Sequence, residues 1–397
     1  MSTNEQEEVL VASRRRLSER LRDETTGGVL LIISAIFAIA WANSPWSDSY
    51  QNLISVKCGI HNFQLPLSIW AADFLLAIFF LVVGIELKHE FVAGSLSSVK
   101  KAVVPFLAAF GGMAMSAIIF LLFNHGLVTA SAWGIPISTD IAFALAILAI
   151  AGRQLPAPLR IFLLTLAVVN DLGAIVVIAI FYGHGFHLRA FVIALVLIAV
   201  FAALQKFGVQ SVAAYIPLAL ASWYFMYESG IHATVAGVLL GLSMRVAKND
   251  GELQSPAHRT EHVLRPISAG LCVPLFALMS AGVDLDGVKF HDVITSSLTL
   301  GIVFGLVIGQ PVGVLAGTFI GTRFTGKRLP SGLKWADVIV VGTLASIGFT
   351  VALLVSEVSF GSDPQLLVIS KCALVLTNLV AVASSVTAMK IRARNLA

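Results

Sequence analysis

The chain has 397 residues, of which 57% are hydrophobic and 12% are charged, and its mean hydropathy is +0.90. Soluble domains carry about 25% charged residues, so this chain has too little polar surface to cover a water-soluble globule. The formal net charge of +4 does not indicate nucleic-acid binding, because the lysine and arginine residues lie in short loops between apolar blocks.

The apolar blocks predict an all-α integral membrane protein, since a spanning helix needs roughly 20 mainly apolar residues. Residues 1–26 are polar and are expected to form a cytoplasmic extension rather than a cleaved signal. Residues 27–389 form the predicted membrane domain, and residues 390–397 a cytoplasmic tail. Twelve spans are predicted, at about 27–43, 68–86, 102–123, 134–151, 159–182, 190–205, 211–227, 231–245, 266–283, 296–321, 336–356 and 365–389.

The distribution of basic residues predicts the topology. With a cytoplasmic N-terminus, the cytoplasmic segments hold 22 of the 26 lysine and arginine residues. The outer loops hold only Lys57, Arg189 and Lys289, and Lys371 lies near the start of the last span. Because cytoplasmic loops of membrane proteins carry an excess of basic residues, both termini are expected in the cytoplasm.

Two loops stand out by length. The outer loop 44–67 contains short β-like runs around His61 and Asn62, which predict a small hairpin. A polar connector at 246–265 separates eight spans from the last four.

The fourth and eleventh spans are interrupted, by residues 134–140 (GIPISTD) and 342–350 (GTLASIGFT). Proline removes a backbone donor and glycine weakens a helix, whereas serine and threonine can satisfy the freed backbone groups. Broken helices at corresponding places in two repeats point to a transporter site at mid-membrane. Ordinary kinks and close helix packing explain the same residues, so this pattern alone leaves both interpretations open.

A carboxylate deep in the membrane is the more informative signal, because it costs roughly 2.5–3.5 kcal/mol on insertion scales. Asp171 lies about twelve residues into the fifth span. One carboxylate that holds either H⁺ or Na⁺, but not both, is the minimal chemistry of exchange. Asn170 and Thr139 add neutral oxygens, which suit a hard cation. The alternative is a structural aspartate that is hydrogen-bonded to a neighbouring helix.

Two further acids lie deep within predicted spans. Asp140 is inside the interrupted fourth span, where a carboxylate can offset the positive ends of facing half-helices or bind the ion directly. Asp73 is either a buried hydrogen-bonding group or part of an access path.

Four titratable residues lie nearer the membrane surfaces. Glu86 ends the second span, and Glu261 and His262 lie in the connector. Each belongs either to a pH-sensing cluster or to an ordinary solvated surface. His232 begins the eighth span, and it either caps a helix or titrates near physiological pH.

No resident cofactor or metal is expected. A Walker A motif, a dinucleotide-binding fingerprint and a clustered His/Cys set are not found, and the three cysteines are widely spaced. Na⁺, Li⁺ and H⁺ would be transported substrates. A sodium-coupled symporter and a cation channel are the alternatives to an antiporter.

Five segments resemble the NhaA family of sodium/proton antiporters. They are 79–88 (FFLVVGIELK), 136–144 (PISTDIAFA), 170–175 (NDLGAI), 229–237 (SGIHATVAG) and 346–350 (SIGFT). The resemblance implies inverted repeats of spans 3–5 and 10–12 that cross at the interrupted spans 4 and 11. It also implies a bacterial cytoplasmic membrane and a homodimer through the outer hairpin around 46–66.

The same resemblance implies roles for individual residues. Asp171 resembles the principal ion-binding and proton-exchanging carboxylate, Asp140 the charge that balances the crossed helix ends, and Thr139 its neighbour at the crossing. Asp73 matches a buried acid of the second span. The residues that match positions tied to the pH response are Glu86, His232, Glu261 and His262.

This sequence departs from the family pattern at the site itself. Asn170 stands where the family usually has a second aspartate, and Gln310 where it usually has a lysine. A negative and a positive charge are therefore lost together, which leaves no uncompensated buried charge. The departure predicts altered, electroneutral coupling in place of two protons per sodium. Arg265 likewise replaces a family histidine.

Overall fold

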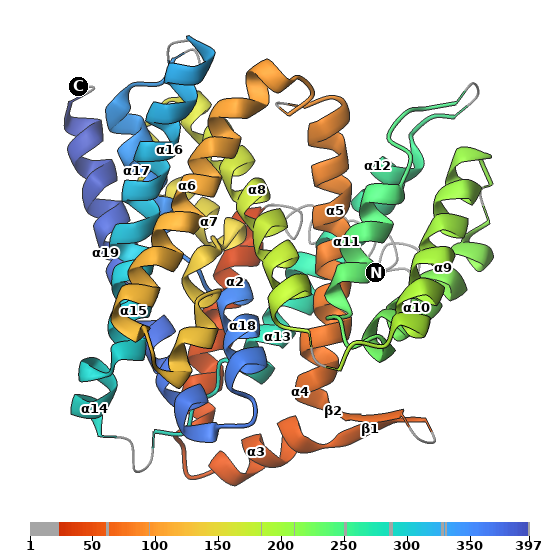
Figure 1. The fold of residues 1–397 in the computed structure, drawn as a ribbon, viewed down its shortest axis with the longest axis horizontal. Helices are drawn as coiled ribbons and strands as arrows, with labels where there is room; N and C mark the ends of the chain where they lie inside the picture. Colours follow the sequence, from red (N-terminus) through yellow and green to blue (C-terminus); the bar gives the residue numbers. More distant parts are fainter. Residues whose placement is uncertain are drawn as a thin grey trace, which may run out of the picture.

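The computed structural model describes residues 24–60, 63–94, 96–183, 185–209, 211–249, 252–285, 289–326, 329 and 332–395. Most of the predicted N-terminal extension lies outside these residues, as do His61, Asn62 and the last two residues of the tail. The described chain is helical apart from one two-stranded hairpin, so the predicted all-α fold is confirmed (Figure 1).

All twelve predicted spans coincide with helices. The first six are α2 (Glu24–Ala42); α4 (Leu67–Ile69), η1 (Trp70–Leu75) and α5 (Leu76–Val92); α6 (Val99–Asn124); η2 (Val128–Ala132), η3 (Ile135–Ile137) and α7 (Ile141–Ala151); α8 (Ala157–Phe181); and α9 (Leu188–Lys206). The other six are α10 (Val212–Glu228); α11 (Thr234–Ser243); α12 (Pro256–Ile267), η4 (Ser268–Cys272) and α13 (Val273–Ser280); α15 (Ser297–Phe304), η5 (Gly305–Gly309) and α16 (Gln310–Thr325); α17 (Trp335–Ala345) and α18 (Thr350–Phe360); and α19 (Pro364–Arg394). The short helix α14 (Phe290–Thr295) precedes α15.

These helices differ in their capacity to cross a bilayer. Within the described residues, seven are long and apolar enough to do so, and the number rises to 10 if each bent pair is one span. The two remaining predicted spans are α10 and α11, with 17 and 10 residues. Both belong to the region where the predicted spans are joined by very short loops.

The predicted hairpin forms at one end of the bundle. Strands β1 (Lys57–Ile60) and β2 (Phe63–Pro66) pair antiparallel, with Lys57 opposite Pro66 and Ile60 opposite Phe63. Helix α3 (Ser47–Ser55) lies beside them, across the ends of the other helices (Figure 1). We call this side the hairpin end. The C-terminus and the connector 246–265 lie at the opposite side, the connector end (Figure 1).

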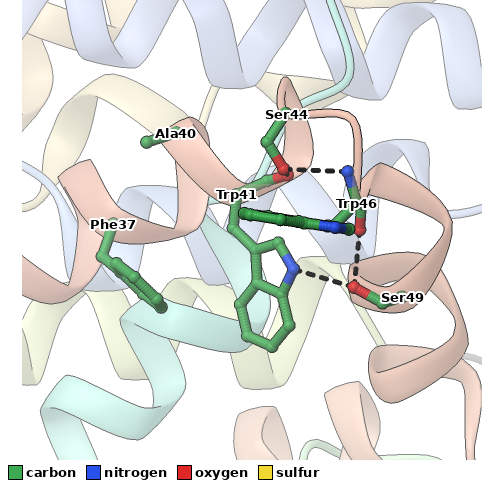
Figure 2. Close-up of a pocket in the computed structure, with 6 residues that line it drawn as sticks. All are labelled: Phe37, Ala40, Trp41, Ser44, Trp46 and Ser49. Atoms are coloured by element: carbon green, nitrogen blue, oxygen red, sulfur yellow. Dashed lines mark hydrogen bonds between the residues drawn. The ribbon is translucent and has the colours of Figure 1, made fainter.

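The corner between α2 and α3 contains a hollow of about 440 Å³ (Figure 2). The Trp41 indole donates to the Ser49 hydroxyl at 2.9 Å, and that hydroxyl donates to the Trp46 carbonyl at 2.6 Å. Two tryptophans, Trp41 and Trp46, lie at this corner, and tryptophan is enriched at membrane–water interfaces. The hollow has no titratable lining, and its residues are Phe37, Ala40, Trp41, Ser44, Trp46 and Ser49.

Close helix packing places the first residue of α16 inside the bundle. A Cβ at Gly313 would overlap the Gly111 carbonyl, and one at Gly317 would overlap the Leu107 carbonyl. Small residues of this kind let membrane helices approach backbone to backbone. The contact of α6 with α16 therefore holds Gln310, which is fully buried, against the middle of the fold.

Candidate ion-binding site

The two interrupted spans meet at their breaks. The fourth span bends by 48° between η3 and α7, and the eleventh bends by 43° between α17 and α18. The Asp140 backbone N–H donates to the Ile347 carbonyl at 2.7 Å, and a Cβ at Gly348 would contact the Ser138 carbonyl at 2.5 Å. The two breaks thus face each other directly, and glycine at 348 is required by this close approach.

Asp140 joins the N-terminal ends of both half-helices that leave the crossing. One carboxylate oxygen accepts the Phe143 N–H of α7 at 3.0 Å, and the other accepts the Thr350 N–H that begins α18 at 3.1 Å. A helix N-terminus carries about half a positive charge, so one carboxylate offsets two such ends. Both Asp140 oxygens are thus committed to backbone N–H groups, and the balancing role stays a prediction.

Neutral side chains cap the opposite, carbonyl-bearing ends. The Thr139 hydroxyl donates to the Ala345 carbonyl at the end of α17 at 2.7 Å. The Gln310 amide donates to the Ile137 carbonyl at the end of η3 at 3.1 Å. A lysine at 310 would supply a positive charge to this partly negative end, whereas glutamine supplies only a hydrogen bond.

Asp171 lies where two apolar clusters of the core meet. Val168 and Val169 belong to the cluster that contains α17, and Ala174 and Ile175 to the cluster that contains much of α18. Asp171 is 2% exposed, and its Oδ1 has no hydrogen-bond partner. A buried polar atom without a partner is costly, so this oxygen is suited to a ligand that comes and goes.

Further oxygens near the crossing are also buried and without a partner. Asn170 donates its amide N–H to the Thr139 hydroxyl at 2.9 Å, which leaves Asn170 Oδ1 unsatisfied. The same holds for Gln310 Oε1 and the Ser138 hydroxyl. Among the described residues there is no group of three or more His, Cys, Asp and Glu that could hold a metal ion.

The helix geometry beside Gln310 was not predicted from the sequence. Residues 305–309 form the π-helical turn η5 directly before it. Pro311 follows, and a proline cannot donate the backbone hydrogen bond that a regular helix needs at that position. Such turns are frequent at functional sites, so the dipeptide Gln310-Pro311 is the signal that sequence analysis can use.

The predicted pH-response residues divide between the two ends. At the connector end Arg265 contacts the Glu86 carboxylate and lies 3.4 Å from that of Glu261. His262 lies one helical turn after His258, and the centres of the two imidazole rings are 6.4 Å apart. The structure therefore brings Glu86 and Glu261 together through the arginine that replaces a family histidine.

His232 lies at the hairpin end instead. Its Nδ1 is 3.2 Å from the Asp73 carboxylate, and the Trp223 indole donates to the Asp73 carbonyl at 3.0 Å. Asp73 also lies in the π-helical turn η1 and is buried. The histidine thus pairs with the buried acid of the second span.

Among the ion pairs that were not predicted from the sequence, two join α19 to its neighbouring helices. Arg392 near the end of α19 holds Asp337 in the first turn of α17, with N–O distances of 2.6 and 3.2 Å. Lys371 on α19 lies 3.3 Å from Glu357 on α18. Glu357 lies one residue beyond the predicted end of its span at 356, whereas α18 continues to Phe360.

Comparison with known proteins identifies the family of this chain. The sequence model of the family described as Na⁺/H⁺ antiporter 1 matches residues 18–389. The chain belongs to this family. A Na⁺/H⁺ antiporter NhaA 3 of Streptomyces coelicolor is 48% identical over 96% of this chain and 81% of its own length. The NhaA of Thermobifida fusca is 44% identical over 95% of this chain and 94% of its own length.

A solved structure supports the fold. The sodium proton antiporter MjNhaP1 from Methanocaldococcus jannaschii aligns over 97% of this chain and 98% of that chain, with a TM-score of 0.52 and 13% identity. Membership of the Na⁺/H⁺ antiporter 1 family makes this a multi-pass membrane protein that exchanges Na⁺ and H⁺. The resemblance predicted from five segments is confirmed.

Proposed function

We propose that Asp171 is the group at which this antiporter binds Na⁺ or Li⁺ in exchange for H⁺, as a secondary active transporter. The observation that carries this proposal is the partnerless Oδ1 of a carboxylate buried at the middle of α8. A carboxylate in such a place binds a proton or a small cation, and either ligand prevents binding of the other.

The neutral oxygens nearby supply the rest of a cation's shell. Asn170 Oδ1, Gln310 Oε1 and the Ser138 hydroxyl are buried and lack partners. Carbonyl and hydroxyl oxygens suit a hard cation, which needs several oxygen ligands to replace its water. Thr139 serves as a positioning residue, because its hydroxyl joins Asn170 to the end of α17.

We propose that the exchange moves one H⁺ for each Na⁺. Asn170 cannot titrate, Gln310 carries no charge, and Asp140 uses both carboxylate oxygens to hold two half-helices. Asp171 is then the one proton carrier of the crossing. A one-for-one cycle moves no net charge, whereas a cycle that moves one charge gains about 2.3 kcal/mol per 100 mV of membrane potential.

Transport in reconstituted liposomes tests this proposal. Addition of Na⁺ or Li⁺ to vesicles with a preformed ΔpH should dissipate the gradient, and K⁺ should do so far less. With the potential clamped by K⁺ and valinomycin, rates and end points should not respond to voltage. A clear response to voltage would overturn one-for-one coupling and direct the search for a second proton carrier to Asp140. An absent response to Na⁺ and Li⁺ between about pH 6.5 and 9 would overturn the assignment of the transported ions.

The orientation and environment are part of the same proposal. The connector end faces the cytoplasm of a bacterial plasma membrane, which is supported by the basic residues of the loops there. The cluster of Glu86, Arg265 and Glu261 lies at this end and is proposed to respond to cytoplasmic pH. The hairpin around 46–66 is proposed to join two copies of the chain.

A further inference from the structure

Polar side chains at seven-residue intervals along α19 contact the eleventh span. Seven residues make nearly two helical turns, so these side chains lie along one face of α19. Each is buried, and each contacts a different part of the eleventh span. The contacts are Lys371 with Glu357 (3.3 Å), Asn378 with the Gly348 carbonyl (2.9 Å), Ser385 with the Thr343 carbonyl (2.8 Å) and Arg392 with Asp337 (2.6 Å). Helix α19 thus holds both half-helices of the eleventh span and the break between them.

The carbonyl groups at this break are held from two sides. A helix leaves its last carbonyls without partners inside the helix, so other groups must satisfy them. From the fourth span, the Thr139 hydroxyl and the Asp140 N–H each donate to one of these carbonyls at 2.7 Å. From α19, the Asn378 amide donates to the carbonyl of Gly348. One side chain of α19 therefore completes a set of contacts that the fourth span begins.

Asn378 uses both N–H groups of its amide. One donates to the Gly348 carbonyl, and the other donates at 2.8 Å to the Leu374 carbonyl one turn earlier in α19. The side chain is 5% exposed, and its Oδ1 has no hydrogen-bond partner. A buried amide oxygen without a partner is costly, so an asparagine here needs a compensating role. The role that the contacts indicate is to supply a donor to the Gly348 carbonyl.

Gly348 lies between the two contacts that join the breaks. Before it in the chain, the Ile347 carbonyl accepts the Asp140 N–H, and after it the Thr350 N–H donates to the Asp140 carboxylate at 3.1 Å. A Cβ on Gly348 would lie 2.5 Å from the Ser138 carbonyl, so the two chains are in direct contact here. Rotation of the Gly348 peptide group would therefore displace the backbone groups that hold Asp140.

We propose that Asn378 is a positioning residue of the ion site, which keeps the break of the eleventh span in the conformation that binds Na⁺. The inference rests on the proposed exchange at Asp171, because Asp140 and Thr139 shape the same crossing. Without the amide, the Gly348 carbonyl loses its donor, and a buried carbonyl without a partner costs about as much as a tenfold change in an equilibrium constant. The conformation that binds Na⁺ is then less populated, and the apparent affinity for Na⁺ falls by the same factor.

Asn378→Ser tests this role, because serine is too short to reach Gly348 but can still bond to the carbonyl one turn earlier in α19. The KM for Na⁺ in reconstituted vesicles should rise by about tenfold. The rate per folded molecule at saturating Na⁺ should stay near the wild-type value, since the bound ion restores the conformation that binds it. Asn378→Ala should show the same rise in KM, so that the result does not depend on one substitution.

Ser385→Ala is the matched control. It removes a buried hydrogen bond from the same face of α19, nearly two turns further along the helix. The Thr343 carbonyl that it releases still accepts from the hydroxyl and the N–H of Ser346. The KM of Ser385→Ala for Na⁺ should therefore equal that of the wild type.

The outcomes separate a positioning role from a purely structural contact between α19 and the eleventh span. A structural contact predicts a lower melting temperature and less folded protein in Asn378→Ser, with an unchanged KM for the molecules that fold, and that result would overturn the inference. An equal rise of KM in Ser385→Ala would overturn it too, because the effect would then come from a general loosening of α19. Absence of exchange in the wild type, or full exchange in Asp171→Asn, would instead refute the proposed function.

Discussion

Replacement of Asp140 by asparagine tests how the crossing is held together. The carboxylate accepts backbone N–H groups from Phe143 and Thr350, one on each oxygen. Asparagine has one acceptor oxygen, so one of these donors is left facing an amide NH₂. A hydrogen bond to a charged group contributes about 1.5–3 kcal/mol, and a charge at a helix end about 0.3–2 kcal/mol. The uncharged asparagine avoids the cost of burying the Asp140 carboxylate, which offsets part of this loss. Asp140→Asn should therefore lower the free energy of unfolding by about 2–4 kcal/mol.

The matched variant is Asp171→Asn, which should not lower the free energy of unfolding. Its Oδ1 has no partner to lose, so removing a buried charge leaves stability unchanged or higher. Thermal unfolding of purified protein in detergent, followed by tryptophan fluorescence, should give a lower midpoint for Asp140→Asn alone. Transport should be abolished in Asp171→Asn and only impaired in Asp140→Asn. The reasoning fails if Asp140→Asn melts at or above the wild type, or if Asp171→Asn still exchanges ions.

Two other predictions concern charge. Gln310→Lys buries an unpaired ammonium and should destabilise the fold by about 3–5 kcal/mol. Adding Asn170→Asp supplies a carboxylate partner, so the double variant should regain stability and its transport should respond to voltage. A double variant whose transport does not respond to voltage would contradict this. In the connector, Arg245 lowers the pKa of Glu252 from 4.5 to about 2. Because the pKa of Glu252 is lower in the folded protein than in the unfolded chain, the Arg245–Glu252 pair stabilises the connector fully above about pH 4.5. This stabilisation is lost as the pH falls to about 2. Hydrogen exchange of the Asn249 amide, which donates to Glu252 at 2.9 Å, should be slower than in Glu252→Gln near pH 6 but equal near pH 2.

The spans, their breaks and the deep acids could be predicted from sequence because each leaves a local signal. An aspartate within a long apolar run is costly wherever its partners lie, so Asp171 and Asp140 stand out without a structure. Glycine and proline likewise mark the two breaks, since their effect on a helix is a property of the residue itself. The length of each apolar block was sufficient to place the helices.

Partners across the bundle could not be predicted, because they depend on which helices become neighbours. Nothing near Asp337 in the sequence points to Arg392, which lies 55 positions later. Gln310 was recognised as a change of charge, but its bond to the Ile137 carbonyl depends on how η3 packs beside the turn η5 that precedes Gln310. Glu357 was missed for a simpler reason: α18 continues past the predicted span end to Phe360.

The bond between Asp140 and the Thr350 N–H also has a consequence for biosynthesis. Its two ends are 210 positions apart, so the ribosome finishes the fourth span long before it makes the eleventh. Contacts of such sequence separation form late, because the chain between them must first be ordered. A nascent chain with only its first ten spans in the membrane has no second half-helix for Asp140 to hold. The crossing is therefore assembled late, and an unfinished chain lacks the proposed ion-binding site through which a cell could lose its ion gradient.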